Sequence, residues 1–177
     1  MEKIILVIFS EIDSRYIAGL KTGLETAFKR NVEINNQINN LKYAYDRARN
    51  QYTSPRLLSR LRRMRKAPAD KVMAVVDVDL YSPGYDFIYG EADVKAGLAT
   101  LSIYRLRETT ANGRPDSHLL MERIIREAMH EVGHLYGLVH CKNPKCVMRT
   151  CTCAAEVDEA GNGLCADCQG TLNPNLM

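Results

Sequence analysis

Residues 130–140 read HEVGHLYGLVH, and this stretch decides how the rest of the chain is interpreted. On a helix, His130 and His134 lie one turn apart on the same face, where two imidazoles can bind one Zn²⁺ at about 2.1 Å each. Glu131 is rotated by about 100° from His130. It can therefore approach the open side of that metal without ligating it, which is the position of a general base acting on water.

His140 can join the same site only if the helix stops. A continued helix would carry His140 about 9 Å beyond His134, too far to share a metal. Gly137 lies between them, and glycine tolerates the left-handed backbone that ends helices. The spacing therefore predicts a helix, a sharp turn and a third ligand from the far side. Three neutral histidines leave zinc one open position for water, as in catalytic zinc sites.

All the cysteines lie in the tail of the chain. They are Cys141, Cys146, Cys151, Cys153, Cys165 and Cys168. Two close pairs of thiolates are the usual ligand set of a tetrahedral structural zinc, and such pairs are Cys141 with Cys146 and Cys165 with Cys168. A bound zinc would order a tail that has few apolar residues. The intervening Cys151 and Cys153 could replace members of this set, stay as free thiols or form a disulfide.

The composition is that of an ordinary globular protein of 177 residues, with 46% apolar and 25% charged residues, which excludes disordered and collagen-like classes. A net charge of +3 neither demands nor forbids an anionic partner. The longest apolar run, Ile4 to Phe9, is too short for a membrane span and lacks a signal-peptide cleavage site. We expect a cytoplasmic protein, in which cysteines serve metal binding rather than disulfides.

Upstream of the histidines, the apolar pattern predicts strands that alternate with helices. Apolar runs predict strands at residues 3–10, 71–80 and 97–106, and a short exposed strand within 31–40. Helical spacing predicts helices at about 15–30, 54–66 and 116–137. Residues 81–90 are expected to be irregular. This order favours an α/β sandwich with a mostly parallel sheet.

Two further expectations concern the last of these helices. Asn112, Gly113 and Pro115 predict a turn before it. His118 is expected at the surface, and the charged residues of the helix on a solvated face. These charged residues are Glu122, Arg123, Arg126 and Glu127.

HEVGHLYGLVH, the Cys141 that follows it, Cys146-Val147-Met148 and Cys165-x-x-Cys168 together resemble the archaemetzincins. These are cytoplasmic zinc-dependent metallopeptidases of archaea, some bacteria and vertebrates. The signature covers residues 130–168, and the upstream segment 75–107, which contains DFIYGEAD, is similar in style. The resemblance predicts a metallopeptidase that hydrolyses bonds in a peptide or small protein.

The resemblance implies a metzincin-like three-layer sandwich. Its twisted, mostly parallel sheet has one antiparallel edge strand, which we expect around Tyr89 to Val94, where an extended peptide could add as a further strand. One metallopeptidase domain would span residues 1–177. Within it, an N-terminal α/β subdomain (1–137) ends in the active-site helix, and a small irregular C-terminal subdomain (138–177) carries the Met-turn and the cysteine zinc.

The resemblance also implies the roles of individual residues. His130, His134 and His140 would bind the catalytic zinc, Glu131 would be the general base, and Met148 would form the apolar floor of the Met-turn. A second, structural Zn²⁺ would be held by Cys141, Cys146, Cys165 and Cys168. The chain would thus bind two zinc ions. Gly137 would support the site by turning the chain.

One departure from related metzincins concerns the oxyanion. Some carry a tyrosine just after the Met-turn methionine, whereas Arg149 and Thr150 stand there in this chain. Stabilisation of the oxyanion would then rest on zinc itself and on Tyr or Arg residues elsewhere.

Other functions remain open at this point. Basic residues crowd residues 54–66 and could contact a nucleic acid, although a solvated helix face is favoured because the net charge is small. They are Arg56, Arg60, Arg62, Arg63, Arg65 and Lys66. A zinc protein with a non-proteolytic binding role and an amidase acting on a non-peptide are further alternatives. The sequence leaves endopeptidase or aminopeptidase action and the oligomeric state undecided.

Overall fold

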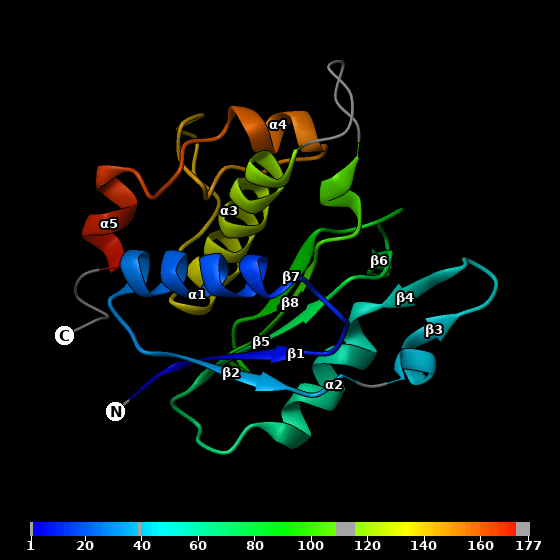
Figure 1. The fold of residues 1–177 in the computed structure, drawn as a ribbon. Helices are drawn as coiled ribbons and strands as arrows, with labels where there is room; N and C mark the ends of the chain where they lie inside the picture. The colour runs from blue at the N-terminus through cyan, green and yellow to red at the C-terminus, as the bar shows by residue number, and fades with distance from the viewer. Residues whose placement is uncertain (1, 39, 109–115, 173–177) are drawn as a thin grey trace.

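A five-stranded twisted sheet forms the centre of the protein (Figure 1). We describe it from a computed structural model that covers residues 2–38, 40–108 and 116–172. The strand order is β2-β1-β5-β8-β7, and only β7 runs antiparallel to its neighbour. The strands are β1 (Ile4–Ile8), β2 (Val32–Asn36), β5 (Lys71–Val76), β7 (Gly90–Asp93) and β8 (Leu98–Ser102). This confirms the mostly parallel sheet with an antiparallel edge strand.

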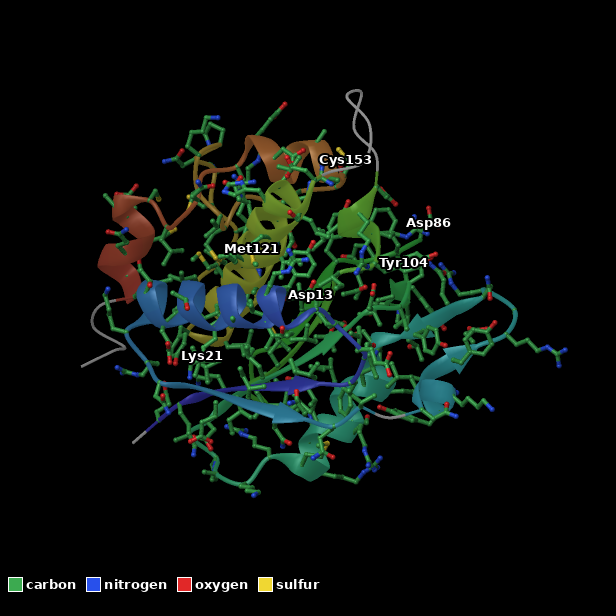
Figure 2. All side chains as sticks on the ribbon, in the orientation of Figure 1. Asp13, Lys21, Asp86, Tyr104, Met121 and Cys153 are labelled. Carbon is green, nitrogen blue, oxygen red and sulfur yellow. The ribbon has the colours of Figure 1, made fainter. Side chains whose placement is uncertain are left out.

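Helices cover both faces of this sheet, which gives three layers. Figure 1 shows α1 (Ser14–Phe28) and α3 (Ser117–Leu135) on one face and α2 (Ser54–Met64) on the other. Alternate strand side chains explain the two cores: Leu6 and Met73 pack with the α1 and α3 side chains, whereas Val7 and Ala74 pack with those of α2. Met121 lies between α3 and α1 (Figure 2).

Helix starts follow local capping chemistry. The side chain of Asp13 accepts a hydrogen bond from the Arg15 N–H at 2.8 Å, and Asp116 accepts one from Leu119 N–H at 2.8 Å. Each satisfies an N–H that the helix itself leaves unpaired. The helices therefore begin where the sequence predicts them.

A second, three-stranded sheet was not predicted. It consists of β3 (Tyr45–Asp46), β4 (Gln51–Thr53) and β6 (Leu80–Tyr81). The strand predicted at 71–80 is in fact split between β5 and β6. Asp77 and Asp79 interrupt it, and their carboxylates pair with Arg107 and Arg105. Strands of two or three residues are too short to show a period in the sequence.

The tail is more regular than predicted. Helices α4 (Ala154–Glu159) and α5 (Ala166–Leu172) form within it, and the short 3-10 turns η1 (Leu41–Ala44) and η2 (Arg105–Arg107) occur earlier in the chain. Figure 1 shows α4 packed beside the N-terminal half of α3. Val157 and Leu172 extend the core beneath α1 and α3. The tail is therefore part of the main core.

The prediction that four charged residues of α3 are exposed to solvent is wrong for three of them. Arg123, Arg126 and Glu127 are buried, with exposed fractions of 0%, 7% and 8%. The guanidinium of Arg123 donates to both oxygens of Asp158 at 2.6 and 2.7 Å and to the carbonyl of Leu106. Sequence periodicity could not reveal this, because the tail that covers these residues folds back from more than 30 positions away. His118 is exposed, as predicted.

Three of the basic side chains on α2 bind their own chain. Arg56 donates to the Tyr43 carbonyl, Arg62 to Asp93 and Arg65 to the Ala96 carbonyl.

The turn predicted at residues 112–115 lies outside the described residues. Within the described part of the chain, no helix is long and apolar enough to cross a membrane.

We expect Arg123→Ala to lower the free energy of unfolding by about 3–5 kcal/mol, because the variant leaves a carboxylate and a carbonyl without a partner. Arg62→Ala is the control. Its guanidinium also binds an aspartate, but its side chain is 68% exposed, so the loss should stay below about 1 kcal/mol. Urea denaturation measures both, and equal losses would contradict a structural role for Arg123.

Candidate metal centre

The end of α3 and the turn after it bring three histidines together. His130 and His134 lie on α3, and Gly137 follows the helix with a φ of +87°. This left-handed backbone lets the Leu138 N–H bond back to the Gly133 carbonyl at 3.0 Å. The turn is where the spacing predicts it, and it returns His140 towards the helix.

The three imidazoles face a common point. One ring nitrogen from each of His130, His134 and His140 lies within 4.8 Å of the others. The Nε2 atoms of His130 and His134 are 3.0 Å apart. Their Nδ1 atoms lie 2.8 Å from the carbonyls of Val147 and Leu138, respectively. A carbonyl only accepts, so each Nδ1 carries the proton and each Nε2 presents a lone pair.

The lone pairs of the two Nε2 atoms face each other, and the two nitrogen atoms are only 3.0 Å apart. Such an arrangement requires a positive charge between them. Burial lowers the pKa of His130 to about 4, and burial also lowers the pKa of His134. The nearby imidazoles of His134 and His140 lower the pKa of His130 further. Both rings are therefore neutral at neutral pH, which is the state in which imidazole binds metals. The donor set fits a metal ion and not a bridging proton.

Glu131 lies beside this cluster, on the same helix. Burial raises its pKa well above the ordinary value, and the charges of Glu127 and Glu91 raise it further. A cation held by the histidines would favour the ionised carboxylate. Gly90 makes room for it, because a Cβ at that position would lie 2.6 Å from Glu131 Oε1. Strand β7 can thus approach the helix only with glycine there.

A cavity of about 650 Å³ opens above the histidines. One wall is β7 with the loop before it, and the other consists of α3 and residues 149–152. Its polar lining includes Glu91, Glu127 and Arg149, and its aromatic lining includes Phe87 and Tyr89. This volume accommodates several residues of an extended peptide.

Met148 is buried beneath the helix. Its Sδ atom is 2.5 Å from where a Cβ on Gly133 would lie, and its carbonyl accepts from the Cys141 N–H at 2.9 Å. It therefore packs under the turn of helix between the two helical histidines. This is the place that the resemblance to metzincins implies for the methionine.

Four cysteines form a second cluster. The Sγ atoms of Cys141, Cys146, Cys165 and Cys168 lie within 4.8 Å of one another. Cys141 and Cys165 are 3.8 Å apart, and Cys146 and Cys168 are 3.7 Å apart. A disulfide needs about 2.05 Å, whereas thiolates at about 2.3 Å from a tetrahedral zinc lie about 3.8 Å apart. The spacing fits a metal ion.

Backbone N–H groups favour the thiolate form of Cys165, whereas burial raises the pKa of Cys146 and of Cys168. The backbone N–H of Cys168 is the main cause that lowers the pKa of Cys165 to about 7. The Cys165 N–H points at Cys146 Sγ at 3.4 Å, and the Asn143 N–H at Cys141 Sγ at 3.4 Å. Such N–H groups stabilise the negative charge of ligating sulfur.

The two remaining cysteines are not part of this cluster. Burial raises the pKa of Cys151 to about 12, and its Sγ lies 3.9 Å from the Arg149 carbonyl. Cys153 is exposed at the start of α4 (Figure 2). Of the alternatives left open by the sequence, the structure has these two as free thiols.

Sequence reasoning placed residues 89–94 on the substrate-binding edge strand, but it did not predict that four side chains or backbone positions lie beside the histidines: Tyr89, Gly90, Glu91 and Glu127. The first three come from the loop and edge strand, which approach α3 only in three dimensions. Glu127 carried a signal, since it lies four positions before Glu131 and therefore on the same helix face.

Comparison with known proteins identifies the family. Residues 4–174 match Peptidase family M54. The chain is 38% identical to an archaemetzincin of Pyrococcus furiosus, covering 99% of this chain and 94% of that protein, and 35% identical to one of Pyrococcus abyssi, covering 99% and 97%.

Solved structures agree. A zinc-dependent peptidase from Methanocorpusculum labreanum superposes with a TM-score of 0.86 at 30% identity, over 96% of this chain and all of that one. An archaemetzincin from Methanopyrus kandleri gives 0.85 at 31% identity, over 99% and 95%. These matches confirm the resemblance drawn from residues 130–168 and the three-layer fold. The chain therefore belongs to Peptidase family M54, a metallopeptidase family, together with its archaemetzincin relatives.

Proposed function

We propose that the chain hydrolyses peptide bonds with a zinc ion held by His130, His134 and His140. The observation that carries this proposal is that the Nε2 atoms of His130 and His134 face each other 3.0 Å apart. Each ring is held with its Nε2 lone pair free, because its Nδ1–H donates to a backbone carbonyl. Zinc, when bound, acidifies a water molecule and polarises the carbonyl under attack.

Glu131 performs the proton transfers in this proposal. Its carboxylate takes a proton from the attacking water and later delivers it to the leaving amine. The contact with Gly90 on β7 restricts the carboxylate to the cleft side of the helix. Its burial keeps bulk water from competing for the proton.

Strand β7 binds the substrate in this proposal. It lies at the edge of the sheet and pairs with β8 on one side. An extended peptide segment of a peptide or small protein can pair with its other side and so pass the histidines. The cavity beside β7 has the volume for its side chains.

The four-cysteine cluster is proposed to hold a second, structural zinc ion. Cys141 follows His140 directly, so this ion would fix the position of the third histidine. Residues 1–137 and 138–177 would then form two subdomains of one peptidase domain, with their boundary at the Gly137 turn. Free, clustered thiols also favour a reducing cytoplasmic location.

Glu131→Gln should retain zinc but lose peptide hydrolysis by about 10²–10⁴-fold, because an amide cannot accept the proton. Hydrolysis of a peptide library and elemental analysis of zinc measure the two properties. Glu33→Gln, on the exposed strand β2, serves as the control and should keep full activity. Full turnover by zinc-loaded Glu131→Gln would overturn the role of Glu131.

Elemental analysis should give two zinc ions per chain. His134→Ala should remove one and leave the fold intact, whereas Cys165→Ser should remove the other and lower the melting temperature, because the binding free energy of a structural zinc contributes to folding. Cys153→Ser is the matched control and should retain both ions. Loss of zinc from Cys153→Ser, or none from Cys165→Ser, would contradict the ligand assignment.

Gly90→Ala should reduce hydrolysis by at least about tenfold with both zinc ions retained, since the added Cβ displaces the Glu131 carboxylate and misplacement is costly. Gly163→Ala is the control, because nothing lies within 4 Å of a Cβ there. Activity equal to wild type in Gly90→Ala would show that β7 does not position Glu131.

A further inference from the structure

The cavity above the histidines contains buried polar oxygens without partners. Tyr89 Oη and Glu91 Oε2 make no hydrogen bond within the described residues. Tyr89 is 5% exposed, and Glu91 uses only its other oxygen, which accepts from Ser82. Glu127, 8% exposed, has neither a hydrogen bond nor an ion pair to any described residue. All three side chains line the same cavity.

The cations near Glu127 are engaged elsewhere. Arg123 uses its guanidinium on Asp158 and on backbone carbonyls. Arg126 donates to Asn162 and Glu122. The Nη1 atom of Arg149 lies 3.7 Å from Oε2 of Glu159. Within the described part of the chain, no basic side chain neutralises Glu127.

A buried carboxylate without a partner is unfavourable for the free protein. Burial alone raises the pKa of Glu127 to about 7, and no partner among the described residues offsets that cost. An amide or an apolar side chain would suit a purely structural position better. A carboxylate that opens onto a substrate cavity instead marks a position where a ligand can supply the missing charge.

The spacing along α3 places Glu127 beside the reaction centre. It lies one helical turn before Glu131, so their Cβ atoms are about 6 Å apart. The charge of Glu127 acts on Glu131, Tyr89 and Cys151, which surround the same end of the cavity. An extended peptide advances about 3.4 Å per residue. A group on a residue adjacent to the scissile bond can therefore reach Glu127.

We propose that Glu127, together with Tyr89 and Glu91, binds a cationic ammonium or guanidinium group of the peptide substrate next to the scissile bond. A group with several hydrogen-bond donors matches the Glu127 carboxylate, which accepts from no described donor, and the unpaired Oε2 atom of Glu91. The inference rests on the proposed peptidase function and names its substrate class. The cation is either a Lys or Arg side chain or the free α-amino group of the peptide.

The test measures binding separately from turnover. Fluorescence anisotropy on zinc-loaded Glu131→Gln follows labelled peptides that differ only in lysine or norleucine at each position, all with acetylated N-termini. A second pair compares a free and an acetylated N-terminus on the norleucine peptide. We expect the cationic member of one pair to bind about tenfold to hundredfold more tightly. A preference in the first pair assigns a basic side chain, and one in the second assigns the α-amino group.

Glu127→Gln, introduced into the Glu131→Gln protein, should reduce this preference to below about threefold. Glu127→Lys, introduced in the same way, should shift the preference towards a glutamate-containing peptide. Glu122→Gln, on the same helix but outside the cavity, is the matched control and should leave the preference unchanged. Tyr89→Phe removes only a hydroxyl that has no hydrogen-bond partner among the described residues, and it should weaken the preference without affecting folding. It therefore tests the proposal if the Glu127 variants do not fold.

Equal binding of both members of every pair would overturn the inference, as would a full preference in Glu127→Gln. Neither result depends on catalysis. Failure of the proposed function would instead appear as absence of hydrolysis of any peptide by the zinc-loaded wild type, and hydrolysis without charge preference would reject only the role of Glu127.

Discussion

The convergence of three imidazoles on one point is the constraint on which the rest of this structure depends. A straight helix can supply two of them, and the third must come from a chain that reverses within a few residues. Gly137 makes this reversal, and Leu138 then has two tasks. Its N–H closes the helix on Gly133, and its carbonyl fixes the proton on Nδ1 of His134. The residue whose N–H closes the helix therefore also sets the tautomer of His134.

The returning chain has polar anchors in addition to the apolar residues that it contributes to the main core. The Val147 carbonyl sets the tautomer of His130, and Val147 lies between Cys146 of the thiol cluster and Met148 of the core. On the other side, the buried pair of Arg123 with Asp158 joins α4 to α3. The thiol cluster and this ion pair thus hold the backbone that orients the histidines, and the stability of the tail is coupled to the geometry of the site.

Local patterns in the sequence were sufficient to predict the histidine cluster and the two close pairs of cysteines. They left Cys151 and Cys153 open as replacements, and the quartet itself was implied by the family resemblance. Residues four apart on a helix must face the same way, and a glycine at position 137 permits one particular turn. Strands β5 and β8 could also be predicted, since each is a short run of mostly apolar residues. The small sheet and helices α4 and α5 were missed because each strand or helix is too short for a period to show. The burial of Arg123 and the approach of Gly90 to Glu131 depend on partners more than 30 residues away, which a local pattern does not contain.

Two glutamates on one helix face show how distance from the histidines can separate roles. A charge held between the imidazoles would act most strongly on Glu131, which is adjacent to His130, and would favour its ionised form despite its burial. Glu127 lies a full turn further away, with Arg123 turned from it towards Asp158. The attraction of such a charge weakens over that distance, and no side chain in the described part of the chain compensates Glu127. The same helix periodicity that aligns His130 and His134 thus places Glu131 where we propose that it moves protons, and Glu127 where we propose that it recognises charge on the substrate.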